Sequence, residues 1–295
     1  MILGSGLAVL AALLNAVGDL AQRGAARETP GPAGVSLVLR MLRRPVWVAG
    51  VVVSLAGLAV HVVALSIGAL AAVQPLLVLE LPLSVAGAAL VFRIRPAARD
   101  VWAIGLLTAG LAALVYCLRP TGGDAAAVSG TVWAGGLAVV GGAAALLVLA
   151  GWWSDADLRA GLLGAAAGIG YGLTAVLIAA AGAVIVDDPG SALGIWQLYA
   201  AVATGLASFV TLQNGLASGL LVAVEPGLTL LNPIVGVSWG LVLFGEHARP
   251  GVWVVGALAG AVALAVGTVL LARSPLLRAH PRSAEYRGVR GGAEP

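Results

Sequence analysis

Charged side chains are scarce in this sequence, and lysine is absent from it. Only 10% of the 295 residues are charged, whereas about 25% is typical of a soluble domain. Hydrophobic residues make up 60%, and the mean hydropathy is +1.03. The surface-to-volume ratio of a globule does not allow this much apolar surface to be hidden from water. The composition therefore excludes a soluble domain and predicts a chain whose solvent is mostly the lipid bilayer.

Motifs of catalysis and cofactor binding are also missing. The single cysteine, Cys117, excludes an intrachain disulfide. There is no phosphate-binding glycine loop with its lysine, no Cys/His metal set and no Ser-His-Asp order. We therefore expect neither an enzyme nor a cofactor. The arginines lie in loops beside apolar runs, so we expect no nucleic-acid partner.

Apolar runs account for most of the chain and predict an all-α, polytopic membrane protein of about nine helices, since one span needs about 20 residues. The runs cover residues 2–22, 46–67, 70–92, 100–118, 131–150, 160–184, 194–213, 218–244 and 252–272. The segment 33–44 is too short to cross and carries three arginines, so we expect it to lie in the membrane interface. Residues 273–295 are polar and basic, which predicts a disordered tail.

Arginine placement predicts the orientation of the chain. With nine spans, fourteen of the sixteen arginines fall on one side, and only Arg119 and Arg249 fall on the other. Cytoplasmic loops of membrane proteins are enriched in basic residues. We therefore expect a cell-membrane protein with its N-terminus outside and its C-terminus in the cytoplasm.

An internal repeat has a constant separation of 151 residues. The segment Ala72–Pro75 resembles Ala223–Pro226, and the same separation relates Pro82 to Pro233. The repeat maps spans 2, 3 and 4 onto spans 7, 8 and 9, and leaves span 5 as a linker. One odd span makes the second half enter the membrane with opposite polarity, as in many secondary transporters. We predict a first four-helix repeat over 1–120, a linker helix over 129–150 and a second, inverted repeat over 158–272.

Polar residues inside the spans are the candidates for a binding site, because an ionisable group at membrane depth is costly. Glu80, between Pro75 and Pro82, is the principal candidate for binding a cation or proton. Asp19 is the second, although Arg23 one turn on offers it a local ion pair. The prolines remove backbone hydrogen bonds, which predicts matched helix interruptions in the two halves. The further substrate-binding candidates are Asn15, Gln74, Glu225, Asn232, Tyr171 and His61. Carboxylates with few bases favour a cationic or zwitterionic solute.

The stretch Leu230–Pro233 followed by the apolar run to Gly245-Glu246 resembles the end of the penultimate helix in the drug/metabolite transporter superfamily, the EamA-like group. The next helix opens with Trp253 and Gly256, as it does in that family. The resemblance implies two inverted halves and a transport function. Trp47 and Pro75 are also similar to residues of the nine-span NIPA-type magnesium transporters. The first span resembles small multidrug resistance proteins, but Asn15 stands where their coupling glutamate aligns, so that role does not carry over.

The sequence thus predicts a secondary transporter of a small solute that works by alternating access. A divalent-cation permease of the Mg²⁺ type is the first alternative, because Mg²⁺ needs only one or two carboxylates beside its waters. A non-transporting membrane scaffold or auxiliary subunit is the second. The oligomeric state stays open, a homodimer included.

Overall fold

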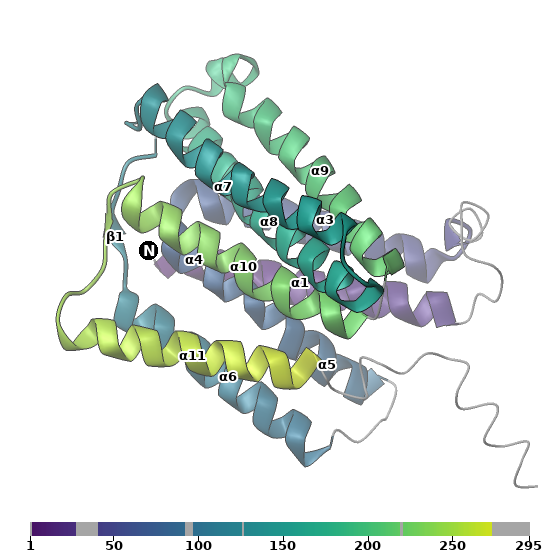
Figure 1. The fold of residues 1–295 in the computed structure, drawn as a ribbon. Coiled ribbons are helices and arrows are strands. Elements are labelled where there is room, and N and C mark those ends of the chain that lie inside the picture. Colours follow the sequence, from purple (N-terminus) through teal and green to yellow (C-terminus); the bar gives the residue numbers. More distant parts are fainter. Residues whose placement is uncertain (1, 28–40, 92–96, 126, 219–220, 273–295) are drawn as a thin grey trace, which may run out of the picture.

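A computed structural model describes residues 2–27, 41–91, 97–125, 127–218 and 221–272, and the regular elements among them are helices apart from one two-residue ladder (Figure 1). The helices are α1 (Ile2–Arg27), α3 (Pro45–Ile67), α4 (Leu70–Leu76), α5 (Glu80–Val91), α6 (Ala98–Leu118), α7 (Gly130–Trp152), α8 (Ala156–Asp187), α9 (Trp196–Ser218), α10 (Leu221–Val242) and α11 (Val252–Ala272). The 3₁₀ segments are η1 (Leu77–Leu79) and η2 (Pro189–Gly194), and the strands are β1 (Thr121–Gly122) and β2 (Glu246–His247). Residues 33–40 of the predicted interfacial segment and the predicted tail 273–295 lie outside the described part.

Seven of the described helical segments are long and apolar enough to cross a membrane. They are Leu3–Gln22, Pro45–Ile67, Leu70–Gly87, Ala98–Leu118, Gly130–Trp152, Leu158–Val186 and Val252–Leu271. α10 adds a shorter apolar stretch, Pro226–Val242. Many large apolar side chains on these helices are exposed, Val139 and Leu146 of α7 by 72% and 68%. The chain is therefore an all-α, multi-pass membrane protein.

Local sequence explains where several helices begin. Pro45 occupies the first turn of α3, where its missing N–H costs nothing. The Asp155 carboxylate accepts a hydrogen bond from the Leu158 N–H and caps α8. At α6, the Asp100 carboxylate accepts a hydrogen bond from the Ala97 N–H at 3.3 Å.

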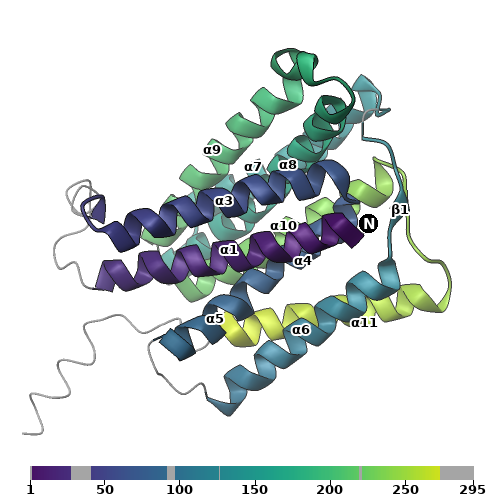
Figure 2. The ribbon, with the colours of Figure 1, turned by 180° about the vertical axis from the view of Figure 1, so that it is seen from behind.

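The starts of two helices repeat the separation found in the sequence. α3 begins at Pro45, and α9 begins 151 residues later at Trp196. Packing repeats as well, because α1 packs along α3 as α8 packs along α9. Figure 2 shows α1 and α3 side by side.

α6 and α11 form a close antiparallel pair. Leu107 of α6 lies against Gly267 of α11, whereas Leu114 lies against Gly260. At the crossing, a Cβ on Gly110 would stand 2.8 Å from the Gly260 carbonyl oxygen, so glycine allows the backbones to touch. α4 and α10 are antiparallel too, since Ala71 meets Gly240 and Gln74 meets Gly236.

The prolines act differently in the two halves. After Pro75, α4 gives way to the 3₁₀ segment η1 before α5 begins at Glu80. α10 continues as one helix through Pro226 and Pro233. The first of the two proline-containing segments is thus interrupted, whereas α10 remains one continuous helix, in which the prolines can only bend the axis. Neighbouring helices α4 and α8 pack on α10.

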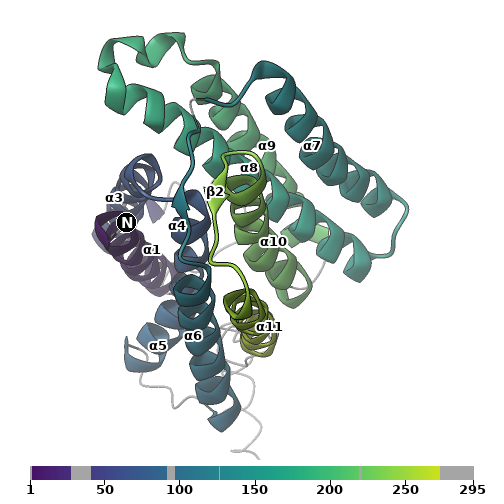
Figure 3. The same cartoon turned by 90° about the vertical axis from the view of Figure 1, so that its left-hand side faces the viewer.

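Loops at one end of the bundle are tied together. β1 follows α6, β2 follows α10, and the two pair antiparallel, with Thr121 opposite His247. The Arg249 N–H donates to the Leu118 carbonyl at 3.2 Å. Figure 3 shows this end, where the N-terminus lies close to β1 and β2 and α7 lies at the edge of the bundle.

Candidate functional site

Asn15 and Glu80 are brought together by α1 and α5. The Asn15 side-chain nitrogen donates to Glu80 Oε2 at 3.2 Å. The Asn15 side chain also packs against Gly57 of α3, where a Cβ would collide with its amide oxygen. Glu80 is the first residue of α5, directly after the 3₁₀ segment. Two predicted site residues therefore meet where the proline-containing helix is interrupted.

Gln74 and Asn232 place unpaired amide atoms inside the bundle. Gln74 is 1% exposed, and among the described residues neither its Nε2 nor its Oε1 has a hydrogen-bond partner. Its side chain packs against Gly236 of α10. Asn232, one turn earlier on α10, has a buried Oδ1 that is likewise unpaired within the described part. A buried polar atom without a partner costs about 1–3 kcal/mol, so these amides are suited to hydrogen-bonding a solute or water.

His61, Asp19 and Tyr171 lie on the helices that carry or pack against these residues. His61 lies one turn after Gly57 on α3, with a buried Nε2 that has no described partner. Asp19 lies one turn after Asn15 on α1 and is half-buried. Tyr171, also half-buried, stands on α8 directly before Gly172, which packs against the Asn232 carbonyl. No described hydrogen bond joins Asn15–Glu80 to the amides of Gln74 and Asn232.

Glu225 and the Asp19–Arg23 alternative are not decided by the geometry. The side chains of Glu225 and Arg23 lie outside the described part, so nothing places either of them. As for metals, no three His, Cys, Asp or Glu side chains are grouped together within the residues the structure describes.

One proline of α4 and one proline of α10 line a common cavity. Pro75 and Pro233 line an apolar cavity of about 200 Å³, together with side chains of α6 and α11 such as Leu114 and Leu264. Its lining is apolar except for Ser238, so it offers a solute little to hydrogen-bond. The amides of Gln74 and Asn232 do not line it.

Glu246 is a buried acid that the sequence does not predict as a site residue. In the sequence it belongs only to the Gly245-Glu246 pair that resembles the EamA-like group. Glu246 is 7% exposed, and its two carboxylate oxygens accept hydrogen bonds from the first N–H groups of α4, those of Leu70 at 2.6 Å and Ala71 at 3.0 Å. These N–H groups have no partner within the helix, so the carboxylate caps α4 from across the bundle. In the sequence, the only sign of this role is the position of Glu246, an acid directly beyond an apolar run.

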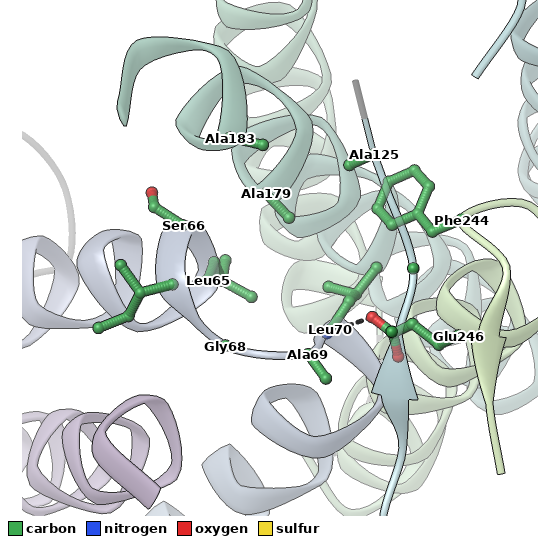
Figure 4. A pocket seen from close by; sticks show the side chains of 13 residues that line it. Leu65, Ser66, Gly68, Ala69, Leu70, Ala125, Ala179, Ala183, Phe244 and Glu246 are labelled. Carbon is green, nitrogen blue, oxygen red and sulfur yellow. Dashed lines mark hydrogen bonds between the residues drawn. The ribbon is translucent and has the colours of Figure 1, made fainter. Parts of the chain in front are cut away.

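A cavity of about 250 Å³ adjoins this carboxylate (Figure 4). It is lined by residues 65–70 at the α3–α4 junction, by Gly122, Gly123 and Ala125, by Ala179 and Ala183 of α8, and by Phe244 and Glu246. Burial raises the pKa of Glu246 above its ordinary value of 4.5, and the N–H groups of Ala71 and Leu70 oppose that rise. The loop end of the bundle thus holds a polar, partly open cavity with one acid in it.

Comparison with known proteins gives one similar sequence without an assigned role. No family model matches the chain, and no solved structure matches it. The chain is 29% identical over 290 residues to an uncharacterized protein of Corynebacterium glutamicum, and the match covers 92% of this chain and 97% of that protein. Similarity therefore extends over nearly the whole of both chains.

Proposed function

We propose that this chain is a secondary transporter of the drug/metabolite type, which moves a small cationic or zwitterionic solute across the cell membrane by alternating access. The observation that carries the proposal is a set of buried, unpaired amide atoms in the bundle that also holds the Asn15–Glu80 contact: Nε2 and Oε1 of Gln74 and Oδ1 of Asn232. A structural core gains nothing from unpaired polar atoms in lipid. A binding site needs them.

Inverted repeats are the architectural part of the proposal. We take α1, α3, α4–α5 and α6 as one half and α8, α9, α10 and α11 as the other, with α7 as linker. The 151-residue separation of the starts of α3 and α9 supports this division. Antiparallel packing of the related helices α6 and α11, and of α4 and α10, supports opposite polarity of the halves. Two halves of like fold can then exchange conformations on either side of a fixed site.

Nine spans follow if α9 and α10 also cross the membrane. α9 is 23 residues long, the same length as α3, and its exposed face carries Val202, Leu206 and Phe209. Its polar Thr204 faces inward and shares a 3.0 Å hydrogen bond with Thr174 of α8. With nine spans the arginine distribution orients the N-terminus outside and the C-terminus in the cytoplasm.

Solute charge is inferred from the acids. Glu80 is the described acid nearest to the unpaired amides in sequence and lies in the same candidate span as Gln74, Leu70–Gly87. A carboxylate and neutral amides suit a solute with a positive charge and hydrogen-bonding groups. The likeness to the EamA-like group agrees with such a function and remains a resemblance carried by Gly245-Glu246, Trp253 and Gly256.

Transport is tested in proteoliposomes with purified protein and a panel of radiolabelled organic cations, zwitterionic amino acids and Mg²⁺. Glu80→Gln keeps the size of the side chain and removes its charge. We expect Glu80→Gln to abolish uptake of the transported solute while the protein stays folded and monodisperse. Asp188→Asn is the matched control, because Asp188 is exposed and caps η2 through Gly190, which asparagine also does.

Outcomes separate the proposal from its alternatives. Uptake that Glu80→Gln abolishes and Asp188→Asn preserves supports the proposed site. Uptake that is unchanged in Glu80→Gln rejects it. Absence of uptake for every compound favours a scaffold, and uptake restricted to Mg²⁺ favours the divalent-cation permease.

A further inference from the structure

The charges of the lining residues determine the electrostatic potential in the cavity beside Glu246. None of the described residues that line it is basic. The last turn of α3 contributes Leu65, Ser66 and Ile67 to the lining, and their carbonyls accept no hydrogen bond from any described N–H. The C-terminal end of a helix carries roughly half a negative charge, and the N-terminal end of another carries roughly half a positive one.

At the α3–α4 junction, the partial charges of these two helix ends offset each other. The first N–H groups of α4 donate to Glu246, and residues of the last turn of α3 line the same cavity (Figure 4). With equal and opposite partial charges, the carboxylate charge of Glu246 is left as the net charge of the cavity. Asp124 and His247 are the nearest other titratable groups in the adjoining loops, and both are exposed.

We propose that this cavity is a binding site for a small organic ammonium cation, held by the Glu246 carboxylate, the α3 carbonyl end and the Phe244 ring. This site is distinct from the one at Glu80. Its place on the route of a transported solute rests on the proposed function, whereas cation binding in the cavity does not. Gln74 lies one helical turn beyond Leu70 on α4, so this second site adjoins the proposed central one.

An ammonium group fits the cavity better than a metal ion does. Both Glu246 oxygens already accept an N–H, so each keeps only part of its capacity. Mg²⁺ keeps most of its waters and binds through one or two carboxylates in strict octahedral geometry, whereas the one carboxylate among the described lining residues is already held by two N–H groups. An organic ammonium donates hydrogen bonds to carbonyls and is attracted by an aromatic face, which Phe244 supplies.

The test titrates methylammonium chloride into the full chain in nanodiscs, with sodium chloride adjusted to keep the ionic strength constant. Tryptophan emission reports binding, because the Trp133 ring lies 6.0 Å from the Phe244 ring. We expect saturable binding to the wild type and affinity lowered roughly tenfold or more in Glu246→Gln, as for the loss of a charge-assisted contact. MgCl₂ at the same ionic strength should not compete.

Two further variants keep the test decisive if Glu246→Gln unfolds. Ala183→Leu fills the cavity without touching the carboxylate and should also weaken binding. His247→Gln removes the exposed neighbouring base and should leave binding unchanged. Binding that is equal in wild type, Glu246→Gln and Ala183→Leu overturns the proposal, as does competition by Mg²⁺.

Glu80→Gln distinguishes this site from the central one. Retained methylammonium binding in Glu80→Gln, with loss in Glu246→Gln, supports a separate site at Glu246 whatever the uptake assay shows. Loss in Glu80→Gln alone overturns it and leaves the proposed transport function standing.

Discussion

Asn15 donates a 3.2 Å hydrogen bond to Glu80 and so joins α1 to the residue at which α5 begins. The carboxylate lies at the end of a 3₁₀ segment inside an apolar bundle, where a polar group without a partner is costly. The contact therefore links a candidate substrate-binding acid to the packing of the first helix.

A double-mutant cycle measures this link. Asn15→Ala removes the donor, and Glu80→Gln removes the charge that it stabilises. We expect a coupling energy of about 1 kcal/mol or more between the two, since hydrogen bonds to charged groups contribute about 1.5–3 kcal/mol. The free energy of unfolding, measured in lipid-detergent mixtures for all four proteins, gives the coupling. Additive effects would contradict a direct contact.

Close packing of α6 on α11 predicts intolerance of bulk at Gly260. A Cβ there would stand 2.6 Å from the Leu114 backbone nitrogen, so Gly260→Leu must push the helices apart. We expect a loss of roughly 1–3 kcal/mol, the usual cost of overpacking. Gly105→Leu on α6 is the matched control, because a Cβ at Gly105 meets nothing within 4 Å. Equal melting temperatures for the two variants would rule out the crossing as described.

Sequence predicted the helices well because apolar run length decides them in lipid. The predicted run 46–67 corresponds to α3 at Pro45–Ile67, and the run 252–272 to α11 at Val252–Ala272. α8 extends beyond its predicted run 160–184 because Asp155 caps it early. These features depend on neighbours in sequence, which hydropathy and capping rules describe.

Contacts between residues distant in sequence could not be predicted from local sequence patterns. The bond from Leu70 N–H to Glu246 spans 176 residues, and no local pattern specifies it. Pro75 and Pro226 occupy related positions, yet only the first is followed by a 3₁₀ segment. Whether a proline interrupts its helix depends on what packs around the freed carbonyls, and a single sequence does not contain that. Among the site residues, Asn15 and Glu80 were both predicted, but their pairing was not.

Membrane orientation gives a prediction that two labels can check. The N-terminus and the β1–β2 ladder lie at the same end of the bundle (Figure 3). A membrane-impermeant thiol reagent should therefore label Thr121→Cys, in a Cys117→Ala background, from the side on which an N-terminal tag is accessible. With nine spans, that side is the outside, and a C-terminal tag should be accessible only from the cytoplasm. Labelling of both termini from one side would exclude an odd number of spans.

Burial of Glu246 predicts a pH dependence of stability with a definite sign. Its pKa is raised in the folded chain, chiefly because burial penalises the charged form. The folded state then binds the proton more tightly than the unfolded state does, so the protonated carboxyl favours folding. The stability that this group contributes is fully present below its ordinary pKa of 4.5 and is lost as the pH rises through the raised pKa.

Glu246→Gln cannot ionise and should remove this contribution. The free energy of unfolding is measured from pH 4 upward for wild type and variant. The difference between the two curves isolates Glu246, because all other groups are common to both proteins. A difference that grows in favour of the wild type as the pH rises would show that the two N–H bonds from α4 outweigh burial, and that the carboxylate is held in its charged form.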